Sequence, residues 1–283
     1  MFSLLKGLFN FLMLTVNVIF WVPILLIFSL IKFLLPIHVL RVQFDKILIA
    51  ISQAWITCNG LWIQGTQKIK WKVSGLHHQF DIRQWYMVSC NHQSWVDIFV
   101  LQYLFNRKIP FLKFFLKKEL IYVPFMGLAW WALDFPFMRR YSKGYLKKHP
   151  EKKGKDFELT KIACEKFKTV PTSVMNFLEG TRITPSKWTK QNSPYKYLLR
   201  PKAGGLALAL EVLGDKFHSF VDVTIVYPEG IPSFWDFLCG RVHEIVVRIE
   251  QIQIPEKFLL GGYSTHSEIR VELQSWVNDI WQK

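Results

Sequence analysis

Cysteine pairs and acidic residues are scarce in this sequence of 283 residues. The four cysteines lie far apart and form no Cys-x-x-Cys pair, which argues against a zinc site or a dithiol redox motif. We expect reduced thiols in a domain that faces the cytosol. Asp and Glu number 21 against 36 Lys and Arg, so the formal net charge is +15 and anionic partners are expected.

Several common motifs are also absent. With 15 Gly and 13 Pro, the chain is neither collagen-like nor of low complexity. It has no Gly-rich phosphate-binding loop and no dinucleotide-binding fingerprint. It lacks the Gly-x-Ser-x-Gly turn that presents the serine of α/β-hydrolases, and it shows no internal repeat. Neither a common nucleotide-binding loop nor a serine-hydrolase site is therefore indicated.

What the chain does contain is apolar and aromatic surface. Hydrophobic residues make up 51% and aromatic residues 16%, which excludes an intrinsically disordered chain. A chain that is both apolar and strongly basic favours an anionic membrane or phosphate groups as partners. Nucleic acid is the alternative anion, but it does not require so much apolar surface, and no nucleic-acid partner is expected.

The first 65 residues predict a pair of membrane-anchoring helices. Gly7 to Ile31 contains no charged residue and, as a helix, would extend roughly 37 Å, enough to cross a bilayer core of about 30 Å. No small-residue cleavage site follows it, so a cleaved signal peptide fits poorly. A second uncharged stretch, Ile47 to Ile63, is marginal as a span. The pair either spans the bilayer or lies in one leaflet.

Residues 66–283 predict a layered α/β domain, because short apolar runs alternate with segments of helical character. Thr265 opens a final helix, with Glu268 three residues later as a capping box. Strands are expected from 69 to an end at Gly75, and at 86–90, 173–178 and 220–226. Helices are expected at 95–104, 157–167 and 205–213, and a Val/Ile-rich segment with partial alternation lies at 243–254.

The sharpest motif is Asn91 to Asp97, between a predicted strand and a predicted helix. Residues five apart do not share a helix face, so His92 must precede the helix, and Asp97 in its first turns can bend back to one imidazole nitrogen. The other nitrogen can then accept a proton from a hydroxyl, and the substrate's own alcohol can supply it, so no protein serine is required. The alternative is structural, because Ser94 and Asp97 have the spacing of a capping box.

Two further segments carry candidate binding residues. Glu179-Gly180-Thr181-Arg182 follows a predicted strand; the glycine permits a tight turn, and the arginine can hold a phosphate through two hydrogen bonds. Arg139 and Arg140 follow a run of aromatic residues. Taken alone, the first segment is equally typical of a solvated turn and the second of a basic surface turn.

Together these blocks resemble the membrane acyltransferases of glycerolipid synthesis, specifically the 1-acylglycerol-3-phosphate (lysophosphatidic acid) acyltransferases. The resemblance covers about residues 70–230, with four blocks in order at 91–97, 134–140, 177–182 and 223–228. Asp134 stands where the family has glycine, and Leu178 where it has proline. The form of residues 131–140 is especially similar to a bacterial inner-membrane branch related to the enzyme called YihG. The resemblance implies a mixed β-sheet flanked by helices.

The resemblance also implies roles for these residues. His92 would be the general base on the acceptor hydroxyl, and Asp97 would orient it. Arg140, with Arg139 beside it, would bind the acceptor phosphate. The substrate-binding residues Glu179, Gly180, Thr181 and Arg182 would form the glycerol-phosphate end of the site, and residues 223–228 would border the acyl chain. A covalent role for Ser94 or Cys90 is disfavoured, because a two-residue reach from His92 is awkward.

The implied reaction moves a fatty acyl group from acyl-CoA, or from acyl carrier protein, to the free sn-2 hydroxyl of lysophosphatidic acid. No metal and no cofactor are expected, since the thioester donor is already activated. The expected location is the bacterial inner membrane, with the catalytic domain facing the cytoplasm. Two alternatives remain: the same chemistry on another lysophospholipid, such as lysophosphatidylglycerol, or a non-catalytic, membrane-bound basic scaffold that binds lipid or RNA.

Overall fold

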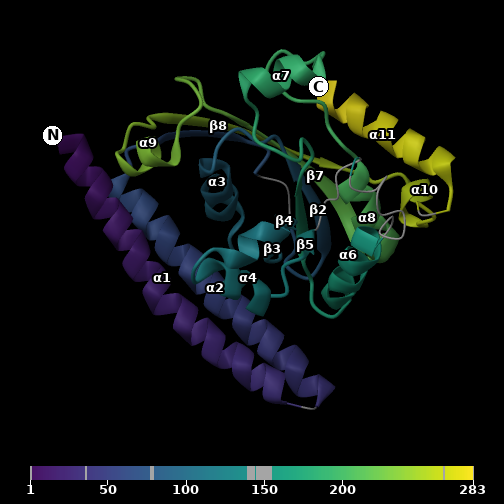
Figure 1. The fold of residues 1–283 in the computed structure, drawn as a ribbon, viewed down its shortest axis with the longest axis horizontal. Coiled ribbons are helices and arrows are strands. Elements are labelled where there is room, and N and C mark those ends of the chain that lie inside the picture. The colour runs from purple at the N-terminus through teal and green to yellow at the C-terminus, as the bar shows by residue number, and fades with distance from the viewer. Residues whose placement is uncertain are drawn as a thin grey trace.

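A computed structural model describes residues 2–35, 37–76, 80–138, 144, 155–263 and 265–282. Two long helices, α1 (Phe2–Leu34) and α2 (His38–Thr66), lie side by side along one flank of an α/β domain (Figure 1). They pack as an antiparallel pair, with Asn17 Nδ2 donating to Asn59 Oδ1 at 2.7 Å and Trp62 Nε1 donating to Asn10 Oδ1 at 2.9 Å. The two uncharged stretches therefore form the predicted helical pair.

A mixed six-stranded sheet forms the centre of the domain, as predicted. Its order is β1-β8-β7-β2-β6-β3, and all neighbours are parallel except the antiparallel pair β7 and β8. The strands are β1 (Lys70–Ser74), β2 (Trp85–Cys90), β3 (Leu112–Phe114), β6 (Ser173–Phe177), β7 (Phe217–Val226) and β8 (Glu244–Ile252). A separate parallel pair joins β4 (Leu116–Lys117) to β5 (Phe137–Met138).

Shorter helices surround this sheet. They are α3 (Val96–Phe105), α4 (Met126–Ala132), α6 (Lys155–Glu165), α7 (Pro185–Gln191), α8 (Gly204–Leu213), α9 (Phe234–Leu238), α10 (Glu256–Leu259) and α11 (Ser267–Gln282), with 3₁₀ turns η1 (Lys118–Tyr122) and η3 (Lys166–Lys168). Of these, α3 packs on one face of the sheet, and α8 and α11 pack on the other. The final helix begins at Ser267, two residues after the predicted Thr265, and Glu268 lies in its first turn.

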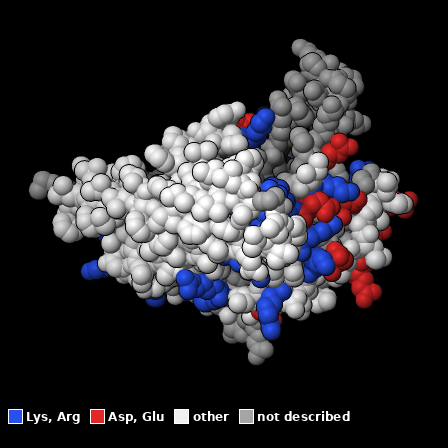
Figure 2. All heavy atoms as spheres, turned by 90° about the horizontal axis from the view of Figure 1, so that it is seen from below, with Lys and Arg blue, Asp and Glu red and all other residues white. Residues whose placement is uncertain are grey.

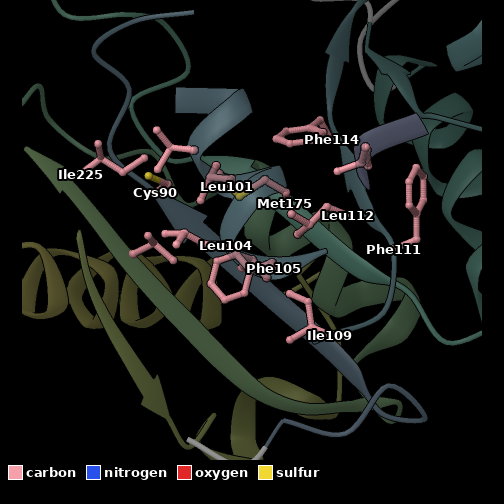
Figure 3. Close-up of a cluster of buried hydrophobic side chains, with 14 of the residues drawn as sticks. Cys90, Leu101, Leu104, Phe105, Ile109, Phe111, Leu112, Phe114, Met175 and Ile225 are labelled. Carbon is pink, nitrogen blue, oxygen red and sulfur yellow. The ribbon is translucent and has the colours of Figure 1, made fainter. Parts of the chain in front are cut away.

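Two hydrophobic clusters lie on opposite sides of the sheet, because successive strand residues point to opposite faces. On β2, Val88 joins the cluster with α3, whereas Met87 joins the cluster with α8 and α11. Figure 3 shows part of the first cluster, with Leu101 and Leu104 of α3 beside Cys90 and Ile225 of the sheet. Because β2 pairs in parallel with both β6 and β7, the carboxyl ends of these three strands lie at the same edge of the sheet.

Candidate active site

Three parallel strands bring the predicted blocks together at one edge of the sheet. β2 pairs in parallel with β6 and with β7, and Cys90 at the end of β2 lies opposite Phe177 and Val223. The first block follows β2, the third follows β6 and the fourth ends β7. The carboxyl ends of parallel strands are where open α/β sheets commonly bind ligands.

His92 and Asp97 are in direct contact, as the motif predicts. His92 Nδ1 lies 2.9 Å from Asp97 Oδ2, the Asp97 side chain is fully buried, and 13% of the His92 side chain is exposed. The same carboxylate oxygen accepts hydrogen bonds from the backbone N–H groups of Gln93 at 2.7 Å and Ser94 at 2.9 Å. Asp97 thus orders the turn before α3 and also orients the imidazole.

Tyr227, in the fourth block, contacts Asp97, a role that the sequence did not predict. Its hydroxyl donates a hydrogen bond to Asp97 Oδ1 at 2.7 Å, and its side chain is buried. Burial raises the pKa of the Tyr227 phenol, so the group stays neutral and acts as a donor. Its position just after β7, which pairs in parallel with β2, is the signal that could have pointed to it.

The imidazole of His92 is fixed on one face by Phe177. The two ring centroids are 3.8 Å apart with an interplanar angle of 12°. The His92 carbonyl accepts a hydrogen bond from Ile183 N at 2.9 Å, which ties the first block to the third. No hydrogen bond from Nε2 to another described residue is present, so this nitrogen is open to a substrate.

Glu179 contacts the backbone of the His92 loop, and Gly180 forms the turn that follows Glu179. Glu179 is fully buried, and its Oε1 accepts from His92 N at 3.4 Å, whereas Oε2 has no partner among the described residues. Burial raises the pKa of the Glu179 carboxyl to about 8. Gly180 has a φ of +68°, the left-handed conformation that the predicted tight turn requires. Within the third block, the buried Glu179 therefore supports the His92 loop from inside the protein and is not itself on the surface.

The cationic side of the site begins at Arg182. Its guanidinium carbon lies 4.7 Å from the centroid of the Trp95 ring, and the side chain is exposed. Lys187, which the sequence did not single out, donates from Nζ to Thr181 Oγ1 at 2.8 Å and to the Arg182 carbonyl at 2.9 Å. Two cations thus lie beside the Glu-Gly-Thr-Arg turn, where an anion can bind.

The second block is described only in part, because Arg139 and Arg140 lie outside the described residues. Asp134 has a φ of +58°, a conformation that glycine adopts freely and Asp tolerates better than most residues. Its carboxylate accepts from Lys32 Nζ at 2.8 Å and also pairs with Lys166. The departure from the family's glycine therefore keeps the backbone turn and adds ion pairs to α1 and η3.

The two residues considered as covalent nucleophiles have unsuitable surroundings. Cys90 is fully buried, and desolvation raises the pKa of its thiol well above the usual value, which disfavours the thiolate. The Ser94 hydroxyl is buried and donates to the Pro232 carbonyl at 2.6 Å. Among the described residues, no group of three or more His, Cys, Asp or Glu is placed to hold a metal ion.

Comparison with known proteins gave one family model and a similar fold. The sequence model of the family described as Acyltransferase matches residues 72–230. Among solved structures, the chain is similar to the 1-acyl-sn-glycerophosphate (LPA) acyltransferase PlsC from Thermotoga maritima, with a TM-score of 0.53 and 19% sequence identity. That match covers 99% of this chain and 97% of the other. The comparison with curated proteins gave no match.

Proposed function

Because the chain belongs to the acyltransferase family, we propose that it transfers a fatty acyl group from acyl-CoA or acyl carrier protein to the free sn-2 hydroxyl of lysophosphatidic acid. The product would be phosphatidic acid. The observation that carries the proposal is the buried Asp97 held against His92, whose second ring nitrogen is open. The structurally similar protein from Thermotoga maritima is an LPA acyltransferase, which supports this acceptor.

In the proposed reaction, His92 Nδ1–H donates to Asp97, which leaves Nε2 unprotonated as the general base. Nε2 removes the proton from the acceptor hydroxyl as its oxygen attacks the thioester carbonyl carbon. The carbon–sulfur bond then breaks, and the imidazolium returns the proton to the departing thiolate. Asp97 stabilises the imidazolium through its charge, so no protein nucleophile, metal or cofactor is needed.

The surrounding residues keep this pair in position. Tyr227 and the backbone N–H groups of Gln93 and Ser94 hold the Asp97 carboxylate by hydrogen bonds. Phe177 fixes the plane of the His92 ring. With a pKa of about 8, Glu179 is largely uncharged at neutral pH, so it adds little negative charge beneath the base.

We assign the acceptor phosphate to the basic residues at the same edge. Arg182 can form two parallel hydrogen bonds with a phosphate, and Lys187 adds a second cation beside it. Arg139 and Arg140, outside the described residues, are proposed to contribute from the second block. Thr181 lies between these cations and the Gly180 turn, at the proposed glycerol-phosphate end of the site.

We further propose that α1 and α2 place the enzyme in one leaflet of a bacterial inner membrane, with the domain on the cytoplasmic side. Both helices are long and apolar enough to cross a bilayer by length and composition. However, α1 contacts the domain near both ends, through Asn10 Nδ2 to the Leu238 carbonyl at 2.7 Å and Lys32 Nζ to Asp134 Oδ2 at 2.8 Å. A perpendicular α1 would draw the polar domain into the bilayer.

The YihG-like branch stays a proposal that rests on residues 131–140. The reasons to consider a different lysophospholipid are Leu178, where the family has proline, and Asp134, where it has glycine. Since the Asp134 carboxylate pairs with Lys32 and Lys166, that substitution has a structural explanation and does not by itself favour another acceptor.

The test is an acyl-transfer assay on purified protein with acyl-CoA and acyl carrier protein donors and a panel of lysophospholipids. We expect lysophosphatidic acid to be acylated, and His92→Ala to lower kcat by roughly 100-fold or more, as expected for loss of a general base. His243→Ala is the matched control, since this exposed histidine lies elsewhere and pairs with Glu229. If His92→Ala keeps more than about a tenth of the wild-type activity, His92 is not the general base. If only lysophosphatidylglycerol is acylated, lysophosphatidic acid is not the acceptor.

A further inference from the structure

The segment from η1 to α4 exposes an unusual amount of apolar surface. Tyr122, Phe125, Leu128 and Trp131 follow one another at intervals of three, and their exposed fractions are 79%, 54%, 52% and 55%. We refer to these four residues as the α4 patch. Large apolar side chains clustered in this way on a surface indicate an interaction site.

The other side of α4 is buried against the N-terminal helices. Ala129 packs with Val22 of α1 and Trp55 of α2 in a small hydrophobic cluster, and Met126 packs against it. The helix that carries the α4 patch is therefore packed directly on α1, which has exposed apolar residues of its own, among them Phe20 and Ile27. Figure 2 shows a broad surface with few charged side chains, bordered by Lys and Arg.

We propose that the α4 patch enters the same lipid leaflet as α1, so that the catalytic domain contacts the membrane through an element of its own. This inference rests on the proposed membrane-bound acyltransferase. The composition fits a lipid interface, because Tyr and Trp are enriched where acyl chains meet headgroups. Lys117 and Lys118, both exposed, precede the patch and suit anionic headgroups.

The chain that directly follows α4 leads to the active site through packed aromatic rings. Soon after α4 ends, Phe135 stacks with Phe114 at a centroid distance of 6.4 Å, and Phe114 stacks with Phe177 at 6.1 Å. Phe177 in turn stacks on His92 at 3.8 Å. Fixing α4 in the leaflet would therefore hold the general base at a set height above the lipid, where an acceptor hydroxyl can reach it.

The direct test is the depth of a nitroxide attached to Leu128→Cys in full-length protein whose four native cysteines are replaced. The protein is reconstituted on vesicles of phosphatidylethanolamine and phosphatidylglycerol, and collisions with oxygen and with a water-soluble nickel chelate are compared. Val271→Cys on α11 is the matched control, since it is also an exposed apolar position. We expect oxygen to dominate at 128 and the nickel chelate at 271.

Equal nickel accessibility at 128 and 271 would overturn the proposal. So would protection of 128 that persists without vesicles and depends on protein concentration, because that result identifies a second copy of the chain as the partner. The depth measurement does not depend on turnover. An inactive protein with a lipid-exposed label would contradict the proposed function, whereas an active one with a water-exposed label would contradict only this inference.

A second variant connects the patch to activity. Leu128→Asp, at an exposed position, should leave folding intact and lower the rate on vesicle-embedded acceptor by about tenfold or more, since a charge replaces an apolar contact with lipid. The rate on a short-chain, water-soluble acceptor should stay within about twofold of the wild type. Equal losses on both acceptors would show that Leu128 supports the fold or the site instead, and would contradict the proposal.

Discussion

Asp97 is the most constrained side chain of the site. Its two carboxylate oxygens accept from two backbone N–H groups, the Tyr227 hydroxyl and the His92 ring, and the side chain is fully buried. Hydrogen bonds to an ionised group are shorter and stronger than neutral ones, so the carboxylate is held in position before substrate binds. This arrangement makes Tyr227 the first residue to test beyond the motif itself.

Tyr227→Phe removes one hydrogen bond and leaves the ring in place. We expect kcat to fall by about tenfold, in line with loss of a hydrogen bond to a charged group. Without the phenol, more negative charge on Asp97 faces the imidazolium, so the acid limb of the kcat/KM pH profile should move to higher pH. Tyr263→Phe is the matched control, because this buried tyrosine donates to the Phe258 carbonyl in the other hydrophobic cluster. An unchanged kcat and pH profile would remove Tyr227 from the mechanism.

Arg182→Ala tests the phosphate contact. We expect the acceptor KM to rise by about 10- to 150-fold, since a charge-assisted hydrogen bond contributes roughly 1.5–3 kcal/mol, while the donor KM changes little. Arg270→Ala, an exposed arginine on α11, is the control. Equal effects on both substrates would show that Arg182 serves the donor or, through its contact with Trp95, the fold.

Glu179 predicts a pH dependence of stability. Burial raises the pKa of this carboxyl from 4.5 to about 8, so the folded state holds a proton that the unfolded state releases. The contribution of Glu179 to the free energy of unfolding is therefore largest below pH 4.5, and it decreases as the pH rises to about 8. Glu179→Gln should flatten that decline, as measured by denaturant unfolding across this pH range. Identical slopes for variant and wild type would mean that Glu179 is ionised in the folded protein.

At the scale of elements, the contacts of α1 decide how the chain meets the membrane. The helix is joined to the domain from Asn10 near one end to Lys32 near the other, and α4 packs near its middle through Ala129 and Val22. A helix that contacts the domain at both ends and near its middle, while most of its apolar side chains stay exposed, suits an orientation within one leaflet better than a crossing. The predicted 1–65 and 66–283 division remains a prediction, although the two parts share one hydrophobic cluster.

This orientation predicts the location of the N-terminus. Phe2→Cys, at an exposed position in a chain with its native cysteines replaced, should not react with a membrane-impermeant thiol reagent on intact cells, and should react after permeabilisation. Leu260→Cys, exposed in the domain, provides the cytoplasmic reference. Labelling of residue 2 from outside would require α1 to cross the bilayer and would contradict the proposed topology.

Across the whole molecule, the features that could be predicted from the sequence are those that depend on residues close together in the chain. Long uncharged runs gave the two helices, alternation of apolar segments gave the α/β class, and the five-residue spacing placed Asp97 against His92. These features depend on residues close in the chain, where helix geometry and side-chain reach limit the outcomes.

Contacts between segments that are far apart in the sequence became visible only in the folded structure. The parallel pairing of β2 with β7 brought Tyr227 to Asp97, and the pairing of β2 with β6 placed Phe177 beside His92. Packing across the fold buried Glu179 and gave Asp134 its partner on α1. The composition of the η1–α4 segment could not show that Ala129 faces inward and Leu128 outward, because the partner surface on α1 lies about a hundred residues away and is set by packing rather than by local sequence.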